Sequence, residues 1–170
     1  MGDDILHDKA KQKAFRFLLV RSRSTKELRS KLMEKGFEKG VVNDVIDSLL
    51  ELKYLDDGAF AESWARNLAV NRLWGNRKIE MSLREKGIGR ELIETAIARV
   101  RNEISEKEAI QKLVEKKCGK SIASETESEF ISPKEKRRLI QNLMSRSFPL
   151  ELIFDVLSSL EEGEYFDDRG

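Results

Sequence analysis

The sequence predicts an all-α fold, an elongated array of three tandem three-helix repeats with about nine helices. Three observations predict it. Charged residues make up 37% of the chain and there are only two prolines, a composition typical of helices with charged surfaces. Apolar residues recur at helical spacing in three aligned copies. Helix-capping residues stand where several of these helices should begin.

The repeat is anchored on Gly36, Gly87 and Ser147. Apolar residues stand eight and four positions before each anchor, and one, five, six, nine, ten and thirteen positions after it. In the first copy they are Leu28, Leu32, Phe37, Val41, Val42, Val45, Ile46 and Leu49. Residues before the anchor share one helix face and those after it share another, and glycine suits the left-handed residue that ends a helix. Each anchor therefore joins two amphipathic helices.

A further amphipathic helix precedes each hairpin, at residues 10–22, 58–73 and 106–117. Residues 119–131 are small and acidic and lack periodicity, which predicts a loop. The predicted organisation is a disordered leader at 1–9, repeats at 10–55, 56–103 and 104–162, the loop at 119–131 within the third repeat, and a tail at 163–170.

Capping signals support these boundaries. Ser24 and Ser105 each precede a glutamate by three positions, the spacing of a capping box. Ser132 stands in the same way before Glu135, with Pro133 at the first helical position. Asp56 or Asp57 can cap the helix that follows. Two adjacent carboxylates could also ligate a divalent ion, but a cap at the positive end of the helix dipole is the commoner use.

Positive charge is concentrated in two segments. Residues 9–35 hold ten basic residues against two acidic ones, and residues 71–120 hold 13 against 8, whereas residues 121–170 hold 6 against 11. Basic segments can attract phosphates or an acidic protein surface, which the acidic last third would repel. The alternative is an ordinary solvated helix face.

Candidate binding residues lie in the two basic segments. They are Arg21, Arg23, Lys26, Arg29, Arg72, Trp74, Arg77, Lys78 and Arg84. Arginine forks onto carboxylate or phosphate, so these residues fit either an acidic protein groove or a nucleic-acid backbone. Trp74 could stack on a base, although an aromatic residue at a helix end more often packs between repeats. Helix-turn-helix DNA binding is a minor alternative, because residues 38–43 make a poor start for a recognition helix.

Catalysis is not expected. The one histidine, His7, lies in the predicted leader, the one cysteine, Cys118, has no partner thiol, and the phosphate-binding glycine motifs are missing. We therefore expect no enzyme activity, no metal and no cofactor. No apolar run approaches the roughly 20 residues of a membrane span, and the opening residues are charged, so we expect a cytoplasmic protein without membrane contact.

Specific motifs resemble the RecX family. The first unit of that family is matched by AFRFL at residues 14–18, RSRS at 21–24, Gly36 with Phe37, and YLDD at 54–57, which includes Asp56 and Asp57. The second unit is matched around Gly75 and Gly87. The resemblance covers about residues 10–160. The chain departs from the family at Ser147, where glycine is usual, at Ser82, where glutamate is common, and in the variable loop.

The resemblance implies an all-helical bacterial regulator of the RecA recombinase, with no catalytic residue. Members of the family lie in the groove of the RecA filament on single-stranded DNA and usually inhibit its ATPase, recombinase and coprotease activities. We therefore expect RecA as the partner of a monomeric chain, with direct contact to the DNA backbone as a further expectation. The alternative is a helical-repeat protein that binds single- or double-stranded DNA without RecA.

Overall fold

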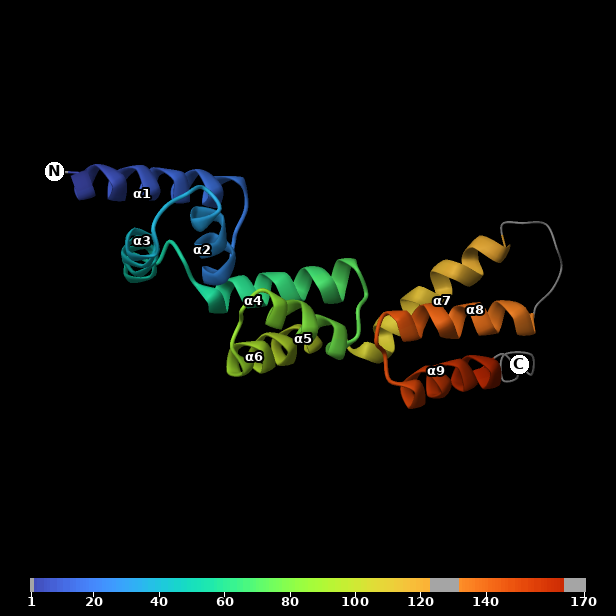
Figure 1. The fold of residues 1–170 in the computed structure, drawn as a ribbon. Coiled ribbons are helices and arrows are strands. Elements are labelled where there is room, and N and C mark those ends of the chain that lie inside the picture. The colour runs from blue at the N-terminus through green and yellow to red at the C-terminus, as the bar shows by residue number, and fades with distance from the viewer. Residues whose placement is uncertain (1, 123–131, 164–170) are drawn as a thin grey trace. The chain divides into compact units, whose positions relative to one another are not determined.

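The computed structural model describes residues 2–122 and 132–163, and the regular secondary structure in these ranges is entirely helical (Figure 1). The helices are α1 Gly2–Val20, α2 Thr25–Met33, α3 Lys39–Glu51, α4 Asp57–Arg66, α5 Asn76–Glu85, α6 Arg90–Arg101, α7 Glu106–Ile122, α8 Pro133–Ser145 and α9 Leu150–Gly163. A π-helical segment, η1 Asn67–Asn71, follows α4 directly. The predicted all-α class, with about nine helices, is confirmed.

Two expected irregular segments are partly helical. The sequence predicted a disordered leader at residues 1–9, but α1 begins at Gly2. The physical reason is support from α3, since His7 Nε2 lies 3.4 Å from Asp44 Oδ2 and Ala10 is fully buried. The beginning of the predicted loop at 119–131 is helical as well, because α7 continues to Ile122. The rest of that loop and the tail beyond Gly163 lie outside the described residues.

The three anchors share one backbone conformation. Gly36, Gly87 and Ser147 have φ of 84°, 80° and 63°. The residue after each anchor donates its N–H to the carbonyl five positions earlier, from Phe37 to Leu32 (3.4 Å), Ile88 to Leu83 (3.1 Å) and Phe148 to Leu143 (3.4 Å). This pattern is the Schellman end of a helix. The register of the repeat is confirmed, and Ser147 takes the left-handed conformation without being glycine.

The aligned apolar positions form the cores. In the first repeat, α1, α2 and α3 pack around fully buried Leu28, Leu32 and Ile46. In the third, α7 and α8 pack on α9, and Leu143 and Ile153 are fully buried. The middle repeat buries the corresponding residues Ile79, Leu83, Ile88, Ile93, Ala96 and Val100. Each large side chain buried in this way stabilises the fold by about 1.5–3 kcal/mol.

The chain forms two compact units whose boundary falls inside the middle repeat. One unit contains the chain up to Trp64 together with Ser82–Ala96, and the other contains Ala65–Met81 together with the chain from Ile97 onward. Each unit therefore holds one terminal repeat, part of the middle repeat, and the junction between them. None of the helices in the described ranges is long and apolar enough to cross a membrane.

Candidate functional site

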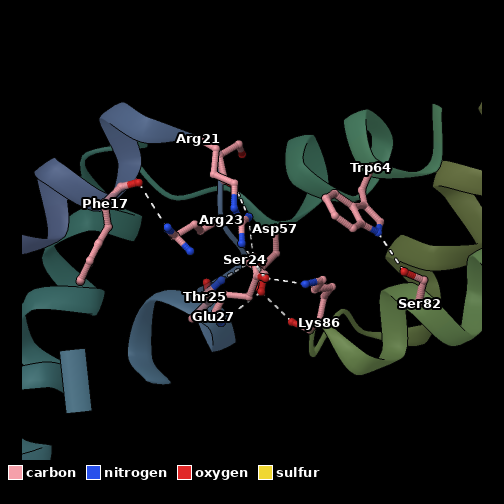
Figure 2. A network of polar contacts seen from close by, with 11 residues as sticks. Phe17, Arg21, Arg23, Ser24, Thr25, Glu27, Asp57, Trp64, Ser82 and Lys86 are labelled. Atoms are coloured by element: carbon pink, nitrogen blue, oxygen red, sulfur yellow. Dashed lines mark hydrogen bonds and ion pairs between the residues drawn. The ribbon is translucent and has the colours of Figure 1, made fainter. Parts of the chain in front are cut away.

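The first junction joins the start of α2 to the middle repeat, within the first compact unit. Ser24 Oγ donates to the carbonyl of Lys86 (2.6 Å), and Lys26 Nζ donates to the carbonyl of Glu85 (3.1 Å). The backbone N–H of Thr25 donates to Asp57 Oδ1 (2.8 Å), as Figure 2 shows. The N-terminus of α2 thus binds both the C-terminus of α5 and the first turn of α4, which satisfies groups that helix ends leave unpaired.

Two features of this junction favour glycine at position 87. Its φ of 80° is left-handed, and a Cβ added there would lie 2.6 Å from Cδ of Lys26. The alkyl chain of Lys26 therefore lies across the glycine on its way to the end of α5. The neighbouring aspartates have separate roles: Asp56 Oδ1 caps α4 by accepting from the N–H groups of Gly58 (2.8 Å) and Ala59 (2.9 Å), while Asp57 serves the junction.

Glu27 lies at the centre of the charges of this junction. Its two carboxylate oxygens accept from Arg21 Nη1 (3.0 Å) and Nη2 (3.1 Å), and Oε1 also accepts from Lys86 Nζ at 2.5 Å (Figure 2). Burial raises the pKa of Glu27, but the hydrogen bonds from Arg21 and Lys86 outweigh burial and lower the pKa to about 2. The carboxylate is therefore ionised throughout the physiological range.

The capping box predicted at Ser24 forms only in part. Ser24 Oγ accepts from the N–H of Glu27 (3.2 Å), as in a capping box. The Glu27 carboxylate, however, accepts from Arg21 and Lys86, and the serine hydroxyl donates to the carbonyl of Lys86. The predicted pairs Ser105 with Glu108 and Ser132 with Glu135 form complete boxes. Hydrogen bonds from the backbone and side chain of Ser105 lower the pKa of Glu108 below its ordinary value. The first box is open because Glu27 binds Arg21 and Lys86 and the Ser24 hydroxyl donates to the Lys86 carbonyl.

Lys86 connects the junction to α4. Its ammonium group lies 5.0 Å from the centre of the Trp64 ring, which stacks on Phe60 with a centroid separation of 5.7 Å. Trp64 Nε1 donates to Ser82 Oγ (3.0 Å), so the serine that departs from the family pattern accepts the indole hydrogen (Figure 2). Cation–π contacts of this kind contribute about 0.5–1 kcal/mol at partly exposed sites.

An open surface pocket of about 210 Å³ lies over the first junction. Its lining includes five cations and two carboxylates: Arg21, Arg23, Lys26, Lys31, Lys86, Glu27 and Glu85. Arg23 is held in place by a 3.3 Å bond from Nε to the carbonyl of Phe17 and by that ring, 5.4 Å away. The excess of positive charge suits an anionic partner.

The second junction, within the other compact unit, makes the same three kinds of contact with different residues. The N–H of Gly75 donates to the carbonyl of Arg146 (2.9 Å), and Lys78 Nζ donates to the carbonyl of Ser145 (2.6 Å). The N–H of Asn76 donates to Glu106 Oε1 (2.8 Å). Again the N-terminus of a repeat's second helix binds the C-terminus of the next repeat's second helix and the first turn of its first helix.

Gly75 must be glycine because an added Cβ would lie 2.5 Å from the carbonyl oxygen of Ser147. Trp74 lies beside two candidate cations, Lys78 at 4.6 Å and Arg72 at 5.7 Å from the ring centre. Its carbonyl accepts from Arg101 Nη2 (2.8 Å). Burial lowers the pKa of Arg101 despite the opposing charge of Glu106.

The structure separates the candidate residues into two groups. Arg21, Arg23, Lys26, Arg72, Trp74 and Lys78 take part in contacts within or beside the two junctions. Arg29, Arg77 and Arg84 are exposed. Arg29 and Arg77 form no hydrogen bond or ion pair with the residues that the structure describes, whereas Arg84 does have a partner. Sequence reasoning gave no role to Arg101 or Arg146. Arg101 donates to the carbonyl of Trp74, and Arg146 donates to the carbonyl of Arg72.

Fold and junctions define a class: a helical-repeat protein whose repeats are joined through helix ends and whose surface is rich in charge. The comparisons agree in detail. The family model "RecX, first three-helix domain" matches residues 10–49, and "RecX, second three-helix domain" matches residues 56–97. The regulatory protein RecX of Mycolicibacterium smegmatis is 32% identical over 151 residues, which cover 89% of this chain and 79% of that protein. This chain belongs to the RecX family of regulatory proteins.

Other relatives support the same assignment. The regulatory protein RecX of Clostridium botulinum (strain Alaska E43 / Type E3) is 28% identical over 94% of this chain and 72% of its own length. The crystal structure of RecX from Lactobacillus salivarius has the same fold, with a TM-score of 0.76 at 21% identity, and the match covers 93% of this chain and 98% of that one. The family is one of regulatory proteins and not of enzymes.

Proposed function

We propose that this protein binds the RecA recombinase filament on single-stranded DNA and lowers its ATPase, recombinase and coprotease activities. Membership of the RecX family carries the proposal, because the similarity to a regulatory protein RecX extends over 89% of the chain. A match of 151 residues in a chain of 170 includes residues 20–151 wherever it begins, so the similarity extends over both junctions and the second basic segment. The family is known for modulation of RecA.

Two exposed arginines support the proposal and identify where to test it. Arg29 on α2 and Arg77 on α5 are bound to no other described residue, so their guanidinium groups are available to carboxylates or phosphates of a partner. Arg21 is a poorer probe, because it is bonded to Glu27 and its loss would disturb the first junction.

The test is RecA ATP hydrolysis on single-stranded DNA with increasing amounts of this protein. We expect inhibition at a stoichiometric ratio, and we expect Arg29→Glu and Arg77→Glu each to raise the concentration needed for half inhibition. Lys116→Glu, which reverses an exposed charge on α7, is the matched control and should inhibit like the wild type. Full hydrolysis in the presence of excess wild-type protein would refute the proposal.

The alternative is binding to DNA without RecA. The basic pocket over the first junction supports this alternative, because its cations can bind phosphates. A protein that neutralises several phosphates loses affinity steeply as salt rises. Binding to naked single- and double-stranded DNA should therefore be measured at several salt concentrations. Strong binding with a steep slope, combined with no effect on RecA, would select this alternative.

A further inference from the structure

We propose that copies of this chain associate head to tail through a third junction, in which the start of α8 of one molecule binds the end of α2 of another. This departs from the monomer that the sequence predicted. It does not depend on RecA, so the two proposals stand or fall separately.

The first observation is that both halves of the first junction occur twice in the chain. The donor half is Ser24-Thr25-Lys26-Glu27, and the acceptor half is Glu85-Lys86-Gly87. The donor pattern recurs as Ser132-Pro133-Lys134-Glu135 at the start of α8, and the acceptor sequence recurs unchanged as Glu34-Lys35-Gly36 at the end of α2.

The second observation is that the second copies have matching local geometry. Ser24 and Ser132 both precede their helices with extended backbone, φ −72° and ψ 161° against φ −59° and ψ 151°. Gly36 and Gly87 both end their helices in the left-handed region, with φ of 84° and 80°. The backbone needed for the junction is therefore preformed on both surfaces.

The third observation is that both second copies are exposed. A Cβ at Gly36 would meet nothing within 4 Å, whereas at Gly87 it would meet Lys26. Lys35 is exposed and is bonded to no other side chain that the structure describes. Residues 132–135 are exposed as well. Each surface is thus an unoccupied version of one that the same chain fills at the first junction.

These matches specify the contacts of the third junction. Ser132 Oγ donates to the carbonyl of Lys35, Lys134 Nζ donates to the carbonyl of Glu34, and Glu135 pairs with Lys35. In the third junction the capping box between Ser132 and Glu135 is broken, so that Glu135 can bind Lys35. Glu27 binds Lys86 in the same way at the first junction, where it does not close a box with Ser24. Pro133 has no N–H, so no carboxylate equivalent to Asp57 is needed. Such a contact uses different surfaces on the two molecules and leaves one half free at each end, so it can extend.

Sedimentation equilibrium of the full chain tests the proposal. The average mass of the wild type should rise with concentration above the 19.6 kDa of one chain. Lys35→Glu replaces the cation that pairs with Glu135 by a carboxylate that repels it, and Lys134→Glu removes the lysine that spans Gly36, so each variant should stay at one chain mass. An equimolar mixture of the two variants retains one intact pair of surfaces and should give a dimer and nothing larger.

Lys116→Glu makes the same charge change elsewhere and should assemble like the wild type, and circular dichroism should show native helix content for all variants. A wild type that remains at 19.6 kDa at every concentration would overturn the proposal. So would assembly that survives both substitutions, or a mixture that does not dimerise.

Discussion

The two junctions have the same geometry but different chemistry. At both, the N-terminus of a helix donates to the carbonyl of the residue before the next repeat's anchor, and a lysine donates to the carbonyl one residue earlier. A carboxylate of the next repeat also accepts a backbone N–H from the start of the same helix. The first bond comes from a side chain, Ser24 Oγ, at one junction and from the backbone of Gly75 at the other. The first junction adds an ion-pair cluster around Glu27, whereas the second adds arginines that donate to backbone carbonyls.

The difference shows what a repeat junction needs to keep. Carbonyls at a helix end are present whatever the side chains are, so a junction aimed at them tolerates Glu85-Lys86 in one repeat and Ser145-Arg146 in the next. Ion pairs need a particular partner and are not repeated.

Gly75→Ala should damage the second junction most. The new Cβ would lie 2.5 Å from backbone oxygen of Ser147 and 2.9 Å from the nitrogen of Phe148, and backbone cannot move aside as a side chain can. We expect a loss of about 3 kcal/mol in the free energy of unfolding, measured by urea titration. Gly40→Ala is the control: it lies in α3 with nothing near its Cβ, and should be neutral or stabilising by up to about 1 kcal/mol. Equal stability of the two variants would contradict the packing argument.

Gly87→Ala should harm the first junction less. Both Gly87 and Gly36 are left-handed, so alanine costs about 1–2 kcal/mol at either position. The added methyl group meets another residue only at position 87, where it meets the flexible side chain of Lys26. We expect Gly87→Ala to be less stable than Gly36→Ala by about 0.5–1 kcal/mol, and replacing Lys26 by alanine should remove the difference. A difference that persists without Lys26 would assign it to another cause.

Glu27→Gln should cost about 1 kcal/mol at neutral pH, because it weakens two ion pairs whose members are partly exposed. The pH dependence identifies the cause. The folded pKa of Glu27 is lowered to about 2 from the ordinary 4.5, so its contribution is complete above pH 4.5 and is lost as pH falls toward 2. The stability difference between wild type and Glu27→Gln should therefore shrink over this window. A constant difference from pH 7 to pH 2 would show that the ion pairs are not its source.

Much of the fold was predictable because the repeat leaves a strong signal in the sequence. The anchors predicted three Schellman ends, and even Ser147 was placed correctly by alignment, although serine gives no local sign of a left-handed residue. The extent of α1 was missed, since its support comes from α3, and such tertiary contacts are not visible in local periodicity.

The candidate site was less predictable. Helical spacing placed Arg21 and Lys26 in a basic segment, but their bonds to Glu27 and to the end of α5 depend on how repeats meet. The box at Ser24 looked like those at Ser105 and Ser132, and only the junction distinguishes it. One available signal was the repeated Glu-Lys-Gly at 34–36 and 85–87, which marks the acceptor half of the junction.

Thr25→Val should have the smallest effect, and the sign of that effect is informative. Thr25 Oγ1 is buried and has no hydrogen-bond partner in the described part of the chain, while the backbone N–H of the same residue makes the bond to Asp57. Valine keeps the branched shape and the backbone bond but removes the unsatisfied hydroxyl, which costs about 1–3 kcal/mol when truly desolvated. Because Thr25 is only half-buried, we expect stability to rise by about 0.5 kcal/mol, seen as a higher urea midpoint with an unchanged slope. Thr25→Ser, which keeps the hydroxyl and loses the methyl group, is the matched control and should be less stable than the wild type. If valine instead destabilised the protein as much as Glu27→Gln, the hydroxyl would have to be hydrogen-bonded in solution, and the first junction would contain a polar contact that its backbone bonds do not include.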